Sequence, residues 1–219
     1  MTTTVFFDLD GTLADTDADI RLSWKAAMSD LGLDCPRFDE VFVAGPSIED
    51  MTRTLFPDKF TPALAADIRE GFGRHYDGDG FPLTREYPGV IDVVRKLKQE
   101  GKRVFIATNK RYIGAKLIAA HFGWDGIFDG LYAGDMHMHD EIGKLAKSEL
   151  LALALRETGA SPGESVMVGD TSSDFKAAAA NSMRSIGVSW GYGTPEELAA
   201  ASAIVDSPTA LLNELLLRQ

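Results

Sequence analysis

Short apolar runs, each followed at once by polar residues, are the feature that most limits what this chain can fold into. The clear runs are residues 5–7, 104–107, 166–168 and 185–188, with weaker candidates at 127–132 and 203–205. Continuous apolar runs of this length are typical of strands that are buried on both faces of a sheet. The runs therefore predict a core sheet rather than an exposed one.

Helical patterns lie between these runs. Val90, Val93, Val94 and Leu97 would share one helix face, and Gly101 is placed to end that helix. Residues 113–120 and 150–155 repeat the pattern, and each stretch is closed by a glycine. Strands that alternate with helices favour parallel β-α-β units. We therefore predict an α/β fold with a Rossmann-like, doubly wound parallel sheet.

One interval, residues 15–86, breaks this alternation because it holds no convincing strand. Ile20, Trp24 and Leu31 fit the face of one helix, and Ser47 resembles the cap of a second. Thr61-Pro62 places a cap and a first-turn proline before a third helix. We expect an all-α domain at 15–86, inserted after the first strand of a core made of 1–14 and 87–219.

The charge balance narrows the possible partners. The chain has 33 acidic and 22 basic side chains and a net charge of −11. Such a surface repels nucleic acids and anionic membranes, so neither is an expected partner. Cys35 is the single cysteine, which excludes an intrachain disulfide. With no signal-peptide pattern and no run of apolar residues long enough to span a membrane, we expect a cytoplasmic protein.

Polar residues after the predicted strands indicate where chemistry takes place. Ligands of open α/β sheets bind beyond the carboxyl ends of the strands. The residues found there are Asp8 and Asp10, Thr108 and Asn109, and Asp170 and Asp174, with Lys144 and Lys147 on a preceding stretch. Two carboxylates about 4 Å apart repel by roughly 4 kcal/mol at an effective dielectric constant near 20. A hard cation such as Mg²⁺ would relieve this repulsion, and it suits a site that also holds a phosphate.

Four of these segments carry a resemblance to a known family. They are Asp8-Leu9-Asp10-Gly11-Thr12, Thr108-Asn109, Lys147, and Gly169-Asp170-Thr171-Ser172-Ser173-Asp174. In this order they resemble the haloacid dehalogenase superfamily, in its phosphoglycolate phosphatase-like branch. The resemblance covers most of the chain, and it implies that residues 15–86 form the family's helical cap.

The resemblance also implies roles for single residues. Asp8 would be the nucleophile that takes the phosphoryl group, and Asp10 the general acid and base. Thr108, Asn109 and Lys147 would bind the phosphoryl oxygens. Mg²⁺ would be held by Asp8, the backbone carbonyl of Asp10, and Asp170, with Asp174 supporting or joining the coordination. Asp174 has an alternative role, because an acid also suits the first turn of a helix.

Several assignments stay open at this stage. Lys147 fits the family's lysine segment better than Lys144 does. Ser47, Arg53 and Arg74 are candidates to contact a substrate from the cap. His137 and His139 form part of a solvated loop or of a separate metal site. Gly191-Tyr192-Gly193 lacks the dinucleotide fingerprint, and we predict a turn that leads into a capped helix at Thr194.

The expected activity is hydrolysis of a small phosphate ester with Mg²⁺ as cofactor, by a monomer or a homodimer. Asp10 argues against a dehalogenase, because members with that activity lack an acid at this place. Ile20 stands where sugar phosphomutases carry a cap histidine. Nucleotidase, pyrophosphatase and sugar-phosphate phosphatase or mutase activities are the enzymatic alternatives. A non-catalytic binding protein on the same scaffold is the alternative from another class.

Overall fold

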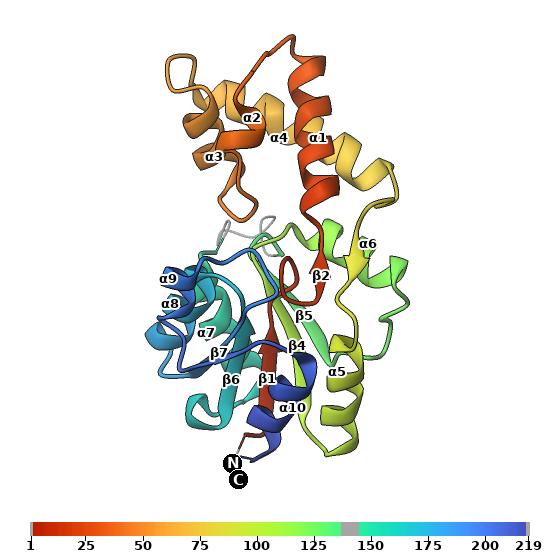
Figure 1. The fold of residues 1–219 in the computed structure, drawn as a ribbon, viewed down its shortest axis with the longest axis vertical. Helices are drawn as coiled ribbons and strands as arrows, with labels where there is room; N and C mark the ends of the chain where they lie inside the picture. The colour runs from red at the N-terminus through yellow and green to blue at the C-terminus, as the bar shows by residue number, and fades with distance from the viewer. Residues whose placement is uncertain (1, 137–144, 218–219) are drawn as a thin grey trace. The chain divides into compact units, whose positions relative to one another are not determined.

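The computed structural model describes residues 2–136 and 145–217. The chain divides into two compact units, Met1–Asp15 with Arg85–Gln219, and Thr16–Thr84. We call the first the sheet unit and the second the helical unit (Figure 1).

The sheet unit is built on six strands in the order β5-β4-β1-β6-β7-β8. Their bounds are β1 Thr4–Phe7, β4 Arg103–Thr108, β5 Gly130–Ala133, β6 Ser165–Gly169, β7 Arg184–Val188 and β8 Ala203–Val205. Every neighbouring pair in this sheet is parallel. The predicted parallel α/β fold is confirmed, and the apolar runs mark its strands.

Helices cover both faces of this sheet. They are α5 Val90–Gln99, α6 Tyr112–His121, α7 Lys147–Thr158, α8 Ser172–Ala180, the single turn α9 Pro195–Leu198, and α10 Pro208–Leu217. Phe6, Phe105 and Met167 pack in one buried cluster with apolar residues of α7 and α8. Since side chains alternate along a strand, Val5 and Phe7 face the other way, where α5 packs against β4 and α10.

Strand β1 is the point where the order of the sheet reverses. It lies between β4 and β6, neither of which is its neighbour in the sequence. In open α/β sheets a crevice forms outside the carboxyl ends of the strands at such a point. Asp8, Thr108 and Asp170 stand at these strand ends.

Two very short strands of the sheet unit lie directly before and directly after the helical unit in the sequence. β2 Ala14–Asp15 pairs antiparallel with β3 Arg85–Glu86. The sequence did not predict this pair, because two-residue strands show no alternation and the paired residues stand 70 and 72 positions apart.

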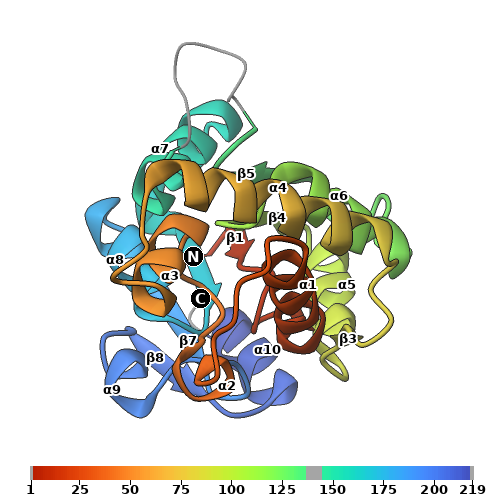
Figure 2. The same cartoon turned by 90° about the horizontal axis from the view of Figure 1, so that it is seen from above.

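The helical unit contains α1 Asp17–Asp30, α2 Phe38–Val41, α3 Ile48–Leu55 and α4 Pro62–Gly78, and its residues include no strand. Helices α1 and α4 pack together, with Gly71 of α4 against Ala27 of α1 (Figure 2). The buried Asp19 accepts hydrogen bonds from the backbone N–H groups of Leu83 and Thr84. This contact joins the first turn of α1 to the last residues of the unit.

The caps predicted for two of these helices are confirmed. The Ser47 hydroxyl accepts from the Asp50 N–H at the start of α3, and the Thr61 hydroxyl accepts from the Leu64 N–H at the start of α4. Among the described residues, no helix combines the length and the apolar character needed to cross a membrane.

Candidate active site

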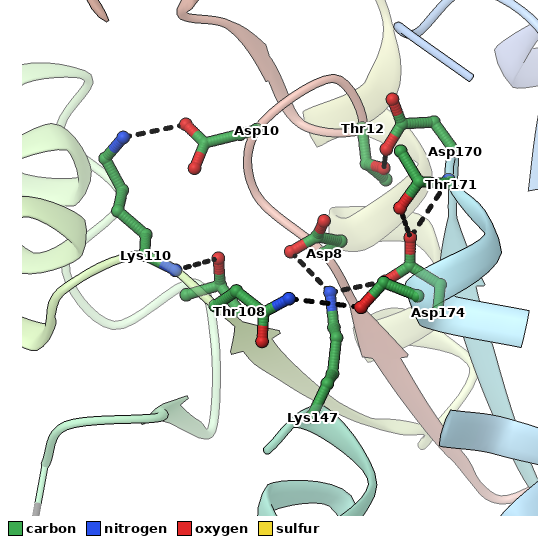
Figure 3. Close-up of polar contacts among 11 residues, drawn as sticks. Asp8, Asp10, Thr12, Thr108, Lys110, Lys147, Asp170, Thr171 and Asp174 are labelled. Atoms are coloured by element: carbon green, nitrogen blue, oxygen red, sulfur yellow. Dashed lines mark hydrogen bonds and ion pairs between the residues drawn. The ribbon is translucent and has the colours of Figure 1, made fainter. Parts of the chain in front are cut away.

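Four charged side chains meet at the carboxyl ends of β1 and β6. Asp8 directly follows β1, and its backbone N–H donates to the Val168 carbonyl at 2.8 Å, so the residue is held beside β6. Asp170 directly follows β6. Lys147 is the first residue of α7, and Asp174 lies in the first turn of α8. Residues that stand far apart in the sequence therefore share one site (Figure 3).

Lys147 is the cation of this cluster. Its side chain is 4% exposed, and its Nζ lies 2.9 Å from Asp8 Oδ1. The same Nζ contacts Asp174 Oδ1. One ammonium group thus pairs with two buried carboxylates.

The arrangement of the acids suits a metal ion. Asp8, Asp170 and Asp174 each offer a carboxylate oxygen, and these oxygens lie within 4.8 Å of one another. Asp8 Oδ1 and Asp174 Oδ1 are both buried. Lys147 forms an ion pair with each oxygen, but neither oxygen accepts a hydrogen bond of good geometry from the residues that the structure describes. When all three acids are ionised, one lysine leaves two negative charges uncompensated. Oxygen ligands with this charge fit a divalent ion such as Mg²⁺.

The pKa values show the cost of collecting these acids. Burial raises the pKa of Asp8 to about 7. The Lys147 ammonium lowers this pKa, whereas the negative charges of Asp174 and Asp170 raise it further. Burial raises the pKa of Asp170 to about 6, although a hydrogen bond from the Tyr192 N–H works against it. Burial also disfavours the charge on Lys147, but the Asp174 and Asp8 carboxylates outweigh it and raise the lysine pKa. Asp8 and Asp170 therefore resist ionising together without a cation.

Asp170 is held through both of its carboxylate oxygens. The Thr12 hydroxyl donates to Oδ1 at 3.3 Å, and the Tyr192 backbone N–H donates to Oδ2 at 2.7 Å. The side chain is fully buried. Two loops from different parts of the sequence therefore fix its orientation.

Asp174 caps a helix and also belongs to the charged cluster. Its Oδ2 accepts from the Thr171 N–H and hydroxyl, each at 3.1 Å, which closes the first turn of α8. Its Oδ1 contacts Lys147. The helix cap and the place in the cluster use different oxygens, so one does not exclude the other.

Thr108 and Asn109 stand at the end of β4, beside the cluster. Thr108 is buried, and its hydroxyl accepts from the Lys110 N–H at 3.1 Å. The Asn109 amide donates to the Ser173 hydroxyl at 3.1 Å. Asn109 thereby joins the β4 end to the first turn of α8, the helix that carries Asp174.

Asp10 points away from the three-acid cluster and toward a lysine that the sequence analysis missed. Lys110 Nζ lies 2.8 Å from Asp10 Oδ1, and the lysine side chain is 7% exposed (Figure 3). The missed signal was positional, because Lys110 comes two residues after a strand, at the same sheet edge as the expected residues. A second buried cation thus stands on the side of Asp10 opposite Lys147.

The other candidates belong to the helical unit or fall outside the described residues. Lys144, His137 and His139 fall outside the described residues. Ser47 caps α3 in the helical unit. There, Arg53 pairs with Glu49 and stacks on the Phe60 ring, while Arg74 pairs with Glu70 and Asp30. These contacts give each arginine a structural partner, and a substrate role stays a prediction.

The comparison with protein families decides the membership of the chain. Residues 5–188 match the family described as haloacid dehalogenase-like hydrolase. The chain belongs to this family. The matched span contains Asp8, Lys147, Asp170 and Asp174, so the predicted family and hydrolase class are confirmed.

Relatives of this haloacid dehalogenase-like hydrolase carry several activity names. A 5′-nucleotidase of Pseudomonas aeruginosa is 29% identical over 90% of this chain and 86% of that protein. A phosphoglycolate phosphatase of Agrobacterium fabrum is 30% identical over 85% of this chain and 80% of that protein. Tyrosine-protein kinase PtkA of Mycobacterium tuberculosis is 29% identical over 96% of this chain and 70% of that protein.

Among solved structures, a predicted phosphatase from Clostridium acetobutylicum has a TM-score of 0.87 and 25% identity, covering 99% of both chains. This similarity extends over the whole length of the haloacid dehalogenase-like fold described above.

Proposed function

We propose that this chain is a Mg²⁺-dependent phosphomonoesterase that works through a phospho-aspartate at Asp8. The observation that carries the proposal is the Lys147 ammonium at 2.9 Å from Asp8, in a buried cluster with Asp170 and Asp174. A nucleophilic carboxylate needs an adjacent positive charge if an anionic phosphate is to approach it. Phosphoryl transfer depends mainly on such positioning and charge stabilisation.

In the first step, an Asp8 carboxylate oxygen attacks phosphorus, and the bond from phosphorus to the leaving oxygen breaks. Lys147 balances negative charge on Asp8 and on the phosphoryl group. Thr108, with Asn109, holds the phosphoryl oxygens by hydrogen bonds. In the second step, water attacks the phosphorus of phospho-Asp8 and releases phosphate, which restores the carboxylate.

Asp10 is the proposed general acid and base. It protonates the leaving alcohol in the first step and takes a proton from water in the second. Its side chain is 21% exposed, compared with 11% for Asp8. Greater exposure suits a group that must exchange protons with solvent, whereas the nucleophile is more protected.

The residues that would hold Mg²⁺ are Asp8, Asp170 and the backbone carbonyl of Asp10, with Asp174 supporting or joining them. When bound, the ion would supply positive charge that stabilises the phosphoryl oxygens. Asp170 is preset for this role by its bonds to Thr12 and Tyr192.

The proposed substrate is a small phosphorylated metabolite, and phosphoglycolate is the first compound to test because of the A. fabrum relative. The P. aeruginosa relative favours a nucleoside monophosphate as a second candidate. We propose that the helical unit acts as a cap that selects among such substrates, with Ser47, Arg53 and Arg74 as candidate contacts. A cytoplasmic location and a monomeric or homodimeric state complete the proposal.

The test is hydrolysis of an aryl phosphate with Mg²⁺, with EDTA, and by the Asp8→Asn variant. We expect phosphate release only in the unsubstituted protein with Mg²⁺. Release of free phosphate also distinguishes hydrolysis from phosphoryl transfer to a protein tyrosine, the activity implied by the name of the M. tuberculosis relative. Activity that survives both EDTA and Asp8→Asn would refute the mechanism.

Substrate choice needs its own measurement. A panel of phosphorylated metabolites compared by kcat/KM should show one preferred compound. Arg53→Ala and Arg74→Ala should reduce that preference if the arginines contact the substrate. If the ranking of the panel stays the same in both variants, the proposed cap contacts are wrong.

A further inference from the structure

We infer that the loop Trp190–Gly193, which we call the 190–193 loop, is a positioning element that sets the orientation of Asp170 for Mg²⁺ binding. The loop joins the end of β7 to α9 and begins 20 residues after Asp170 in the sequence. This inference rests on the proposed function, because it concerns the metal site of that function. It assigns a role to a segment that was predicted from the sequence to be a turn.

The first observation is a direct bond. The Tyr192 N–H donates to Asp170 Oδ2 at 2.7 Å, while the Thr12 hydroxyl holds Oδ1 from another side. Because Asp170 is fully buried, no bulk water can replace either donor. Groups that hydrogen-bond a ligating carboxylate orient it and tune its affinity for the metal.

The second observation is the absence of room for side chains in the loop. A Cβ on Gly191 would collide with the Gly11 carbonyl oxygen and with the Asp170 side chain. A Cβ on Gly193 would collide with the Asp170 carbonyl oxygen. Neither glycine has a φ in the left-handed range. Glycine is therefore needed here for close approach and not for an unusual backbone conformation.

The third observation is that the loop is anchored to the segment that carries Asp8 and Asp10. Trp190 Nε1–H donates to the Thr12 carbonyl at 3.2 Å, and the Tyr192 hydroxyl donates to Asp15 Oδ1 at 3.0 Å. A displacement of the loop would thus change how Asp170 lies relative to Asp8. The loop couples two ligands of the proposed site that come from different strands.

The decisive variant is Gly191→Ala, because the added methyl group must push the loop away from Asp170. We expect Mg²⁺ affinity, measured by calorimetry on the phosphate-free protein, to fall by roughly 10- to 100-fold. Hydrolysis should recover as Mg²⁺ is raised, because the other ligands remain. Gly163→Ala is the matched control, since a Cβ there meets no heavy atom within 4 Å, and its affinity should not change.

If Gly191→Ala does not fold, Tyr192→Phe still tests the inference. It removes the Tyr192 hydroxyl and with it the hydrogen bond to Asp15, and we expect a smaller weakening of Mg²⁺ binding in the same direction. Variants that melt at a lower temperature in EDTA but bind Mg²⁺ as tightly as the unsubstituted protein would overturn the inference. If the unsubstituted protein itself binds no Mg²⁺, the proposed function fails instead.

Discussion

At the scale of single residues, the site depends on one buried ammonium group that serves two carboxylates. Lys147 is almost fully buried and pairs with both Asp8 and Asp174. Removing one member of a buried ion pair leaves a charge that neither water nor a partner stabilises. Lys147 should therefore stabilise the metal-free fold as well as assist catalysis.

We predict that Lys147→Met lowers the free energy of unfolding of the metal-free protein by about 3–5 kcal/mol. Urea denaturation in EDTA at neutral pH measures this change. Lys98→Met is the matched control, because Lys98 and Asp129 form an ion pair whose side chains are 34% and 29% exposed. That substitution should cost less than about 1 kcal/mol. Equal losses in the two variants would contradict the proposed burial effect.

The sequence indicated several residues that would gather at the sheet edge, but it missed Lys110 and did not indicate how the charged side chains pair there. Asp8, Thr108 and Asp170 were expected together because each follows a predicted strand. The pairing of Lys110 with Asp10 depends on contacts across the sheet edge, which spacing along one chain does not reveal. For Asp174 the sequence offered a helix cap and a place at the metal site as competing explanations; the structure shows the cap on Oδ2 and the contact with Lys147 on Oδ1, and metal binding stays a prediction.

At the scale of elements, the apolar runs predicted the main strands, whereas the shortest strands and turns could not be predicted. Strands β1, β4, β6 and β7 coincide with the clearest runs, because the central part of a strand that is buried on both faces is mainly apolar. The β2–β3 pair and the single turn α2 are too short to show a period. The approach of the 190–193 loop to Asp170 is a tertiary contact, and only the two glycines hinted at it.

At the scale of the whole molecule, the acidic site makes stability depend on pH. Burial raises the pKa of Asp8 from 3.8 to about 7, and that of Asp170 from 3.8 to about 6. At a pH between about 4 and these raised pKa values, the folded metal-free protein holds protons that the unfolded chain has released. Its free energy of unfolding should therefore fall as the pH rises through this window. The exposed Asp30 and Glu100 have lowered pKa values, so their opposite contributions lie at lower pH.

We predict that Mg²⁺ raises the melting temperature more at about pH 7.5 than at about pH 5, because at low pH the ion competes with protons. Asp170→Asn should make the metal-free protein more stable than the unsubstituted one at the higher pH. It should also remove most of the shift caused by Mg²⁺. Thermal unfolding with EDTA or Mg²⁺ at both pH values tests this. A metal-free protein that becomes more stable from about pH 5 to about pH 7 would contradict the account.

The central claim is that Asp8 takes the phosphoryl group, and its most direct test is to trap that group on the protein. Asp10→Asn should let Asp8 react with an aryl phosphate, whose leaving group needs little protonation, but should slow the attack of water. After acid quenching, peptide mass spectrometry should find one added phosphoryl group on the peptide that contains Asp8. The signal should require Mg²⁺ and should vanish in the Asp8→Asn, Asp10→Asn double variant. The account would be contradicted if the unsubstituted protein shows Mg²⁺-dependent turnover but the Asp10→Asn variant carries the phosphoryl group on another residue or on none.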